Sequence, residues 1–415
     1  MIKAKPVAVD KIVILGGGHS GVHVATSLRT HGYTGHIVVV EESLHTPYER
    51  PPLSKEILNL SSDDRATPLR KSDFYDSKDV QLVSGVSAEF IDREDRSVTL
   101  GDGSKLEYDC LVLATGSIAS TVRVPGASLA GVLTLKTYDD AMTIRQHLKS
   151  QGRIVVVGAG YIGLEVAAAA AKASCQVTVL EFQDRVMKRV TSPPVSKFFQ
   201  ELHAAHGVDV RVGALLKSIE GDSTVRAVLT EDGQRFDANL VVTGVGVKPN
   251  QDIALKAGIL CEDGVLVDKD GRTSDPAVYA CGDVTRTHDP LVNQSTRLEC
   301  VSHALSQGNR VARAIMALSP PNHEVPWFWT VQYGQRLQTA GVQFPTDETV
   351  IRGIPGSGKF SVLYLRDGVL AALDTINRLS DFIPGKRLIA GKAKIDSSIA
   401  KNPNLRLIEA VIERV

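Results

Sequence analysis

A strand, a glycine-rich turn and a helix follow one another twice in this chain, and this repeat constrains the fold more than any other feature. Residues 12–21 read IVILGGGHSG, and residues 154–163 read IVVVGAGYIG. Each Gly-x-Gly-x-x-Gly follows a run of β-branched residues and precedes a helical stretch. Continuous apolar strands of this kind are typical of a parallel sheet that is buried on both faces. The repeat therefore predicts an α/β fold class.

The three glycines of each turn have separate physical roles. The first allows a tight turn, the second lets the backbone approach a pyrophosphate, and the third permits close packing of helix on strand. The helix N-terminus adds unpaired amides and the positive end of its dipole. The candidates are Gly16, Gly18 and Gly21 in the first turn and Gly158, Gly160 and Gly163 in the second. One such motif is weak, but two copies predict two Rossmann-like dinucleotide-binding folds.

Each second strand ends in an acid at a distance that suits a dinucleotide-binding fold. Glu41 follows Gly21 by 20 residues and Glu181 follows Gly163 by 18, against about 20 in the fingerprint. An acid at this place accepts a hydrogen bond from an adenosine ribose. The spacing favours Glu41 over its neighbour Glu42.

Composition argues against several classes of protein. The 415 residues carry 47 basic and 47 acidic side chains, so we expect no nucleic-acid partner bound through a basic face. Residues 1–18 have no sustained apolar segment before the glycines, and no stretch approaches the ~20 apolar residues of a membrane-spanning helix. We expect a cytoplasmic protein with no signal peptide. Scattered cysteines suit reduced cytosolic thiols, and they are Cys110, Cys175, Cys261, Cys281 and Cys300.

Further motifs in a fixed order give the chain a family resemblance. They are ERPPLSK (49–55), LATGS (113–117), YACGD (279–283), LECVSHAL (298–305), PWFWT (326–330) and DTINRLSDFIPGKRLI (374–389). With the two glycine turns, this order resembles the NADH-dependent ferredoxin reductases of bacterial oxygenase systems, in the glutathione-reductase structural superfamily. The resemblance covers nearly the whole chain. It implies an FAD-binding domain at 1–122 and 253–325, an NADH-binding domain at 123–252, and a C-terminal α+β domain at 326–415.

The activity implied by the resemblance is that of a flavoprotein NADH:ferredoxin oxidoreductase. A hydride would pass from NADH to FAD, and electrons would leave singly to a [2Fe-2S] ferredoxin, plant-like or Rieske type. That ferredoxin would feed a cytochrome P450 or a Rieske oxygenase. We expect a monomer or weak dimer, with neither a metal site nor contact with a membrane.

The resemblance also assigns FAD contacts, motif by motif. The implied contacts are Gly16, Gly18, Ser20 and Gly21 to the pyrophosphate, and Arg50, Ala88, Thr115, Gly116, Lys136 and Val301 elsewhere. Asp283 would accept a hydrogen bond from a ribityl hydroxyl just before a helix, although a plain N-cap is the simpler role for it. Alignment back from PYERPPLSK favours Glu42 for the ribose, whereas the spacing favours Glu41; both acids stay open, and we prefer Glu42.

NADH would lie on the second glycine turn, with further contacts from Tyr161 and Gly246. Tyr161 would move aside for the nicotinamide ring, or would simply pack the helix on the sheet. Glu181 would bond the 2′-hydroxyl and repel a 2′-phosphate, which favours NADH over NADPH. Nearby cations keep NADPH possible, and they are Arg185, Lys188 and Arg189.

The lysine of ERPPLSK, Lys55, is expected to have the main chemical role. A cation beside the flavin stabilises the charge of the reduced ring, and a lysine in an apolar site stays charged only when it is paired. The family pairs this lysine with a glutamate, here Glu165, which alternatively serves the dipole of its helix. Trp329 would border the flavin where the ferredoxin docks. We expect one of Trp327 and Trp329 to be a core residue.

Two other classes of flavoprotein share parts of this pattern. Disulfide reductases and NADH oxidases of the superfamily need a cysteine near the flavin, but residues 43–55 contain none. Cys281 is the nearest thiol, and we expect it to pack at the end of a strand. Flavoproteins like apoptosis-inducing factor, which act as redox-gated binding proteins, typically add targeting segments and insertions. His203 and His206 stand at helical spacing without further ligands, which predicts an exposed helix and not a metal site.

Overall fold

A computed structural model describes residues 9–414, with the side chains of all of them except Arg414. Residues 1–8, on which part of the signal-peptide prediction rests, lie outside the described residues. The chain forms two compact units. Unit 1 consists of Met1–Glu49, Thr67–Ile118 and Lys248–Pro326, and unit 2 consists of Arg50–Ala66, Ala119–Val247 and Trp327–Val415. The division into three domains stays a prediction.

Unit 1 is built on a five-stranded parallel sheet in the order β19-β7-β1-β2-β3. Its strands are β1 (Lys11–Leu15), β2 (His36–Glu41), β3 (Val80–Ser84), β7 (Cys110–Leu113) and β19 (Val278–Ala280). The β-branched residues of β1 and β2 are buried in both directions, as the continuous apolar runs predicted.

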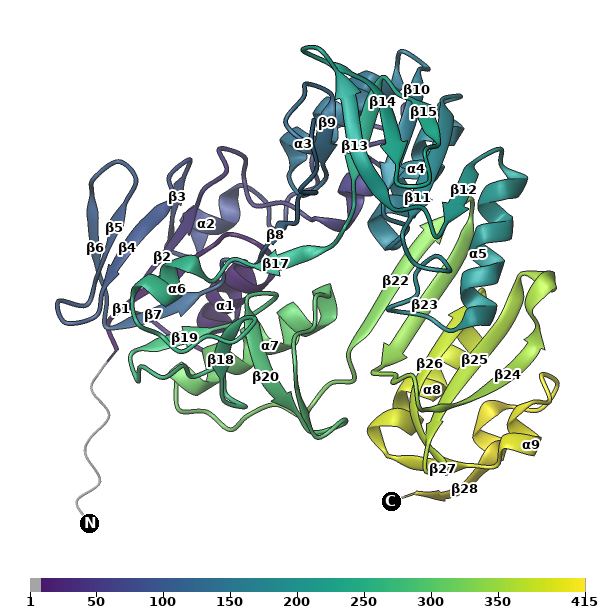
Figure 1. Cartoon of the computed structure of the whole chain (residues 1–415). Coiled ribbons are helices and arrows are strands. Elements are labelled where there is room, and N and C mark those ends of the chain that lie inside the picture. The colour runs from purple at the N-terminus through teal and green to yellow at the C-terminus, as the bar shows by residue number, and fades with distance from the viewer. Residues whose placement is uncertain (1–8, 415) are drawn as a thin grey trace. The chain divides into compact units, whose positions relative to one another are not determined.

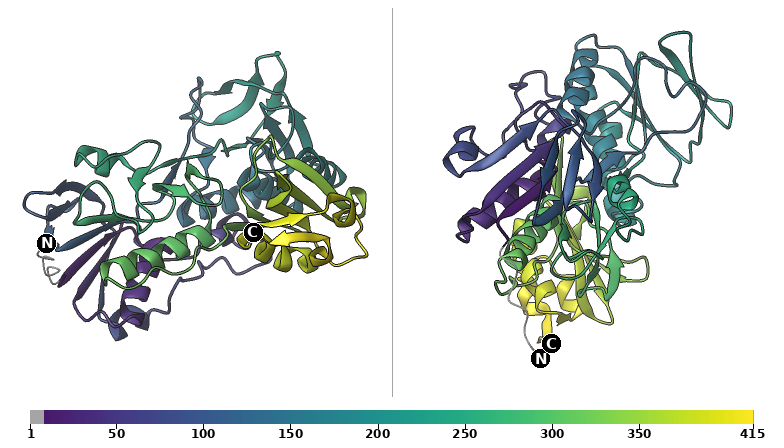
Figure 2. Two further views of the ribbon diagram at one scale, coloured as in Figure 1. Left: turned by 90° about the horizontal axis from the view of Figure 1, so that it is seen from below. Right: turned by 90° about the vertical axis from the view of Figure 1, so that its left-hand side faces the viewer.

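Helices cover one face of this sheet and a small antiparallel sheet covers the other. Figures 1 and 2 show α1 (His19–Thr30) beside α7 (Val301–Ile315), with side chains from both in one core. The second core lies under β4 (Ala88–Asp92), β5 (Ser97–Leu100) and β6 (Lys105–Glu107). The remaining elements of unit 1 are α2 (Asp73–Ser77), α6 (Asp252–Lys256), β18 (Val265–Val267), β20 (Thr285–Asp289) and β21 (Gln294–Thr296).

Unit 2 contains the same architecture a second time. Its parallel sheet has the order β12-β11-β10-β16-β9, and its antiparallel sheet is β13-β14-β15. The strands are β9 (Val132–Thr134), β10 (Arg153–Val157), β11 (Gln176–Glu181), β12 (Asp209–Val212), β13 (Leu216–Gly221), β14 (Val225–Thr230), β15 (Arg235–Asp237) and β16 (Leu240–Thr243). The helices are α3 (Tyr138–Leu148), α4 (Tyr161–Lys172) and α5 (Pro193–Ala205). The two glycine turns therefore lie in equivalent places of two repeated folds.

The C-terminal part of unit 2 is an antiparallel sheet with a helix packed on it. The strands are β22 (Trp327–Gln332), β23 (Gln335–Gly341), β24 (Glu348–Ile354), β25 (Lys359–Arg366), β26 (Val369–Ile376), β27 (Ala393–Ile395) and β28 (Val411–Arg414). Helix α8 (Leu379–Ala390) packs on β26 and β23. Shorter elements are η2 (Pro355–Ser357), α9 (Ser397–Ala400) and η3 (Leu407–Ala410). In Figure 1, β22 runs past α4 and α5, so this sheet joins the second dinucleotide fold in one unit.

Three short elements complete the chain. The segment YERPPLSK turns through one 3₁₀ helix, η1 (Pro51–Ser54), with proline at its first position. The strands β8 (Ser117–Ala119) and β17 (Val247–Pro249) stand where the chain passes between the units. Within residues 9–414, none of the helices has both the length and the apolar character that a membrane span requires.

Candidate functional site

In the first glycine turn, Gly16 and Gly21 have no room for a side chain, whereas Gly18 faces open space where a phosphate would approach. Gly16 has φ +110°, and a Cβ there would lie 2.3 Å from the carbonyl oxygen of Ala114. A Cβ on Gly21 would lie 1.9 Å from the carbonyl oxygen of Gly16. A Cβ on Gly18 would meet nothing within 4 Å, and Gly18 precedes α1 without any side-chain cap. The turn therefore fits a pyrophosphate on free helix amides.

The second glycine turn in unit 2 repeats this geometry. Gly158 has φ +101°, and its Cβ would lie 2.5 Å from the carbonyl oxygen of Gly244. A Cβ on Gly163 would lie 2.0 Å from the carbonyl oxygen of Gly158. Gly160, which precedes α4 without a side-chain cap, again faces open space. The chain thus has two turns that each fit a dinucleotide pyrophosphate.

The acid at the end of β2 that reaches the first glycine turn is Glu41. Its Oε2 accepts a hydrogen bond from the Gly17 amide at 2.6 Å, and its Oε1 accepts one from the Ser43 amide at 3.0 Å. Glu41 is buried, whereas Glu42 is exposed. Which of the two acids contacts a ribose stays a prediction, and the geometry favours Glu41, as the spacing did.

Glu181 takes the equivalent position at the end of β11. Its two oxygens accept hydrogen bonds from the amides of Ala159 at 2.7 Å and Gln183 at 2.9 Å. Arg185 points its guanidinium at the Thr191 carbonyl at 2.8 Å. Lys188 pairs with Asp184 at 3.1 Å, so Arg185 and Lys188 both have partners within the protein. The third neighbouring cation, Arg189, is exposed.

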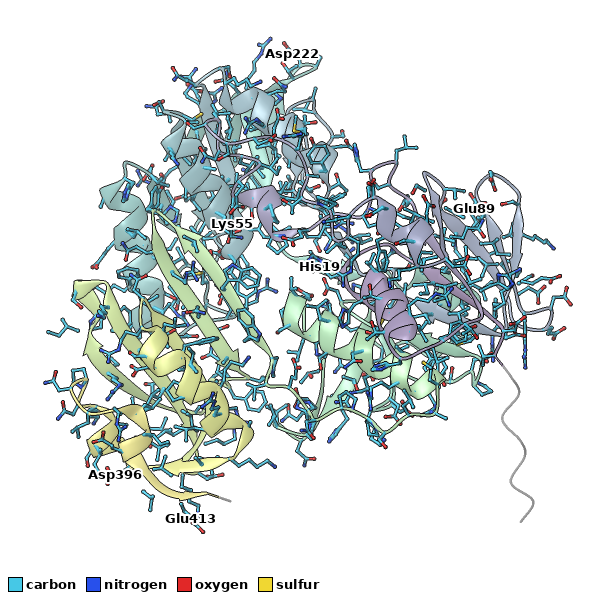
Figure 3. The ribbon with its side chains drawn as sticks, turned by 180° about the vertical axis from the view of Figure 1, so that it is seen from behind. His19, Lys55, Glu89, Asp222, Asp396 and Glu413 are labelled. Atoms are coloured by element: carbon cyan, nitrogen blue, oxygen red, sulfur yellow. The ribbon has the colours of Figure 1, made fainter. Side chains whose placement is uncertain are left out.

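The lysine and glutamate predicted to pair do meet, and both belong to unit 2. Lys55 Nζ lies 2.8 Å from Glu165 Oε1 and 3.2 Å from the carbonyl oxygen of Pro51. The Lys55 side chain is 16% exposed and that of Glu165 only 3%. Figure 3 labels Lys55 at the end of the η1 turn. The fixed φ of Pro51 and Pro52 gives the lysine a rigid base.

Glu165 accepts two further hydrogen bonds, from residues that the sequence analysis did not identify. Ser54 Oγ donates to its Oε2, and Thr330 Oγ1 donates to its Oε1 at 2.5 Å. A buried carboxylate is tolerated when it is both paired and hydrogen-bonded. The pair lines a cavity of about 500 Å³ whose wall includes Lys172, His206 and Tyr333.

Tyr161 opens α4 and packs on the C-terminal sheet. Its ring lies 4.5 Å from that of Phe328 at 32°, and burial raises its pKa well above the ordinary value. The packing role of Tyr161 is therefore present, and its movement for nicotinamide stays a prediction.

The expectation that one tryptophan of β22 is a core residue is wrong. Trp327 and Trp329 are both partly exposed, and their ring centroids lie 5.3 Å apart. Residues two apart on a strand point to the same face, so the pair shares one side of β22. Phe328 and Thr330 point to the other side, toward α4.

The remaining FAD candidates in unit 1 lie in turns and at the first residues of helices and strands. Thr115 Oγ1 donates to the Asn250 carbonyl at 2.7 Å, and Gly116 has φ +67°. Ser20 is buried, with its hydroxyl 3.5 Å from the Cys281 carbonyl oxygen. Ala88 is the first residue of β4 and Val301 the first of α7.

Asp283 accepts a hydrogen bond from Ser117 Oγ at 3.0 Å. The helix expected directly after Asp283 is absent from the described chain, which instead continues into β20. The β-branched residues Val284, Thr285 and Thr287 favour a strand there, so the N-cap role for Asp283 is wrong. Its contact with a ribityl hydroxyl stays a prediction.

Among the other site candidates in unit 2, Arg50 and Lys136 make hydrogen bonds that involve main-chain atoms. Arg50 Nη1 donates to the Lys136 carbonyl at 2.8 Å, and the Lys136 amide donates to Asp140 Oδ2 at 3.0 Å. Gly246 has φ +104°, which suits glycine alone. The predicted exposed position of His203 is wrong, because its side chain is fully buried against β22.

The thiols do not suit nucleophilic chemistry. Cys110 and Cys281 are buried in unit 1, and burial raises the pKa of each thiol to about 12. All five cysteines are free. In the part of the chain that the structure describes, no group of three or more metal-ligating side chains comes together.

Two protein-family models and several curated relatives match this chain. A protein-family model described as pyridine nucleotide-disulphide oxidoreductase matches residues 10–308, and one described as reductase C-terminal matches residues 327–411. The chain is 37% identical over 410 residues to putidaredoxin reductase of Pseudomonas putida, which covers 97% of each chain. It is 39% identical over 388 residues to a ferredoxin–NAD(P)+ reductase of Sphingomonas sp., which covers 93% of this chain and 94% of that one.

A solved structure has the same fold over almost the whole length. The crystal structure of the covalent putidaredoxin reductase–putidaredoxin complex matches with a TM-score of 0.94 and 38% identity, covering 97% of this chain and 98% of that one. These comparisons confirm the predicted fold class, with two dinucleotide-binding domains and a C-terminal α+β domain.

Proposed function

Because the chain belongs to the ferredoxin reductases of the pyridine nucleotide-disulphide oxidoreductase family, we propose that it oxidises NADH and reduces a [2Fe-2S] ferredoxin. It is a flavoenzyme whose cofactors are FAD and NAD(H). Bound FAD supplies the step from a two-electron donor to one-electron acceptors. Each NADH yields NAD+, one proton and two electrons, and two ferredoxin molecules take one electron each.

The observation that carries the proposal is the ion pair between the half-buried Lys55 and the buried Glu165. A cation held at a fixed place stabilises negative charge that develops nearby. The carboxylate of Glu165 holds the Lys55 ammonium in place, with the Lys55 and Glu165 side chains 16% and 3% exposed. The three donors to Glu165 in turn hold that carboxylate in place.

The proposed cofactor contacts follow the two glycine turns. FAD would be held by Gly16, Gly18, Ser20, Gly21, Glu41 or Glu42, Arg50, Lys55, Ala88, Thr115, Gly116, Lys136, Asp283 and Val301. NADH would be held by Gly158, Gly160, Tyr161, Gly163, Glu181 and Gly246. The open space at Gly18 and Gly160 supports the two pyrophosphate positions.

We propose that NADH is preferred over NADPH. The Glu181 carboxylate is buried at the end of β11, where its charge would oppose a 2′-phosphate. Engagement of Arg185 and Lys188 with the protein supports the same preference. A ratio of kcat/KM for the two nucleotides near one would contradict it.

The proposed partner face includes Trp329. Trp327 and Trp329 lie on one side of β22 and are partly exposed, and tryptophan is enriched at protein interfaces. The ferredoxin is plant-like or Rieske in type and serves a cytochrome P450 or a Rieske oxygenase. A panel of purified ferredoxins, assayed by NADH-dependent cytochrome c reduction, would identify the type. Cytoplasmic location and a monomer or weak dimer stay predictions.

The Lys55→Met variant tests the role of the cation. We expect NADH to reduce the flavin at least about tenfold more slowly in stopped flow. We also expect the flavin midpoint potential to fall by about 30 mV or more, which corresponds to a tenfold change for two electrons. The double variant Lys55→Met/Glu165→Gln removes both charges and controls for a lone buried carboxylate. A wild-type rate and potential in both variants would refute the assignment.

A further inference from the structure

A chain of hydrogen bonds continues from the Lys55–Glu165 pair into the C-terminal sheet and on to α5. Thr330 Oγ1 lies 2.5 Å from Glu165 Oε1, and Gln332 Nε2 lies 3.2 Å from Thr330 Oγ1. Gln332 Oε1 lies 2.8 Å from His203 Nε2. All five residues belong to unit 2. The proposed catalytic pair is thus connected to side chains that touch neither glycine turn.

Each bond in this chain points the same way. With Nε2 protonated, His203 donates to the Gln332 oxygen. The Gln332 amide donates to the Thr330 oxygen, and the Thr330 hydroxyl donates to Glu165. Hydrogen bonds in one direction polarise one another and strengthen the last of them, which here is a bond to a charged acceptor. The chain therefore strengthens the hydrogen bond that Thr330 donates to the Glu165 carboxylate and fixes its direction.

Burial sets the protonation state of His203, the residue at the far end of this chain of hydrogen bonds. His203, Thr330 and Gln332 are each at most 1% exposed. Desolvation lowers the pKa of His203 to about 4, so the imidazole stays neutral near pH 7. Its Nδ1 is buried and has no hydrogen-bond partner among the described residues. A neutral imidazole has one N–H, and only Nε2 has an acceptor to receive it.

The register between β22 and α4 explains why these residues meet. Two residues along a strand span about 6.8 Å, and four residues along a helix span about 6 Å. Phe328 of β22 packs on Tyr161 of α4. Thr330, two residues further along the strand, donates to Glu165, which is four residues further along the helix. The next residue on the same side of β22, Gln332, is hydrogen-bonded to His203 of α5. Alternate residues of β22 thus contact α4 at Tyr161 and Glu165 and α5 at His203.

We propose that Thr330, Gln332 and His203 are positioning residues, which orient the Glu165 carboxylate and through it hold Lys55 in place for hydride transfer from NADH. The inference rests on the proposed roles of Lys55 and Glu165. The three residues act through Glu165 and need no contact with either nucleotide. The C-terminal sheet then has a role in the reductive half-reaction in addition to its proposed partner face.

Two substitutions at one position test the hydroxyl. Thr330→Val keeps the shape and removes the donor, whereas Thr330→Ser keeps the donor. In stopped flow of the holoenzyme, we expect Thr330→Val to lower the limiting rate of flavin reduction about tenfold, with the apparent Kd for NADH changed less than about twofold. We expect Thr330→Ser to stay within about threefold of the wild type.

A matched control separates positioning from lost stability. Ser361 Oγ donates to the buried Asp381 carboxylate at 2.8 Å, in the same C-terminal sheet. Ser361→Ala removes an equivalent hydroxyl–carboxylate bond, so it should lower thermal stability as Thr330→Val does and leave flavin reduction unchanged. Equal loss of rate in both variants would overturn the positioning role. Thr330→Val at the wild-type rate, with Lys55→Met impaired, would overturn it and leave the proposed function standing.

The far end of the chain is tested without any turnover. Nitrogen-15 NMR of histidine-labelled holoenzyme should show His203 as the neutral tautomer protonated at Nε2, assigned by loss of its signals in His203→Gln. A signal for the Nδ1-protonated tautomer would reverse the direction of the chain and overturn the proposal. His203→Gln places an amide near the Nε2 position and should keep a faster rate than His203→Asn, which places it near Nδ1. Equal rates in these two variants would also count against it.

Discussion

Lowering the pH should destabilise unit 2 through His203. The imidazole is fully buried, and desolvation lowers its pKa from 6.5 to about 4, while the bond to Gln332 opposes the shift and the neighbouring His206 adds slightly to it. An unfolded chain binds the proton near pH 6.5, and the folded chain does so only near pH 4. At His203 the unfolded state therefore holds more protons between these values, so the stability that this residue contributes is complete above about pH 6.5 and falls as the pH drops toward 4.

The size of the effect follows from the two pKa values. Integrated from pH 7 to pH 5, the difference lowers the free energy of unfolding by about 2 kcal/mol, and the full shift is worth about 3 kcal/mol. Both tryptophans of the chain, Trp327 and Trp329, lie on β22, the strand whose Gln332 bonds His203. Tryptophan fluorescence therefore reports the unfolding of the element that holds the histidine. Burial raises the pKa of Asp374 in the same unit to about 7, so this acid works in the opposite direction as the pH falls. We therefore expect the pH 7-to-5 changes of the urea midpoint in the wild type and in His203→Gln to differ by an amount on the order of 1 M.

Two variants isolate the contribution of His203 from all other titrating groups. His203→Gln should lose the part of the midpoint change that His203 contributes and keep the contributions of Asp374 and of His303, whose pKa burial lowers to about 4. Phe199→Leu, a core substitution in the same helix, should lower the midpoint equally at both pH values, because Phe199 is fully buried and carries no charge. If His203→Gln shows the same drop from pH 7 to pH 5 as the wild type, the reasoning from burial is refuted.

Three further outcomes follow from the geometry. Gly160→Ala should fold normally, because its Cβ meets open space, and should bind NADH about tenfold more weakly in titrations. Gly163→Ala should give little folded protein, because its Cβ would lie 2.0 Å from a carbonyl oxygen. Equal behaviour of the two variants would contradict this. Alkylation of the native holoenzyme should leave NADH-dependent flavin reduction unchanged, since Cys281 is buried, and inactivation would revive a thiol mechanism. Arg352→Met should cost about 3 kcal/mol in urea unfolding, because it removes a fully buried cation from Asp381, and a loss below about 1 kcal/mol would show that Arg378 alone satisfies the acid.

Local sequence patterns predicted the parts of the fold that depend on local geometry. The turn at Gly16 is sterically required by a carbonyl only 2.3 Å from a would-be Cβ, and such a constraint leaves a visible trace in the sequence. The acids at Glu41 and Glu181 end their strands beside these turns, so spacing alone located them. The pairing of Lys55 with Glu165 came from the family resemblance, because the two residues are too far apart for any periodicity to link them.

Errors arose where a residue's surroundings come from distant parts of the chain. His203 occupies a helix whose own pattern permits exposure, but β22 covers it, and nothing near residue 203 signals that strand. The family motif implies a helix after Asp283, but the β-branched residues Val284, Thr285 and Thr287 favour the strand β20 that is found there. The tryptophan error was one of strand geometry, since Trp327 and Trp329 are two residues apart and must share a face.

The network around Glu165 shows how a site can be specified without a motif of its own. Its donors come from segments 111 and 165 residues away in sequence, at Ser54 and Thr330. Each donor is unremarkable locally, because a serine in a 3₁₀ turn and a threonine in a strand are both common. What selects them is the match between a two-residue step on β22 and a four-residue step on α4. A shift of β22 by one residue would turn Thr330 and Gln332 to the tryptophan face and leave a buried carboxylate with fewer donors, at a cost of a few kcal/mol. The geometry of the proposed catalytic pair therefore depends on the register of the C-terminal sheet. A substitution that shifts β22 should also disturb the hydrogen bonds to Glu165.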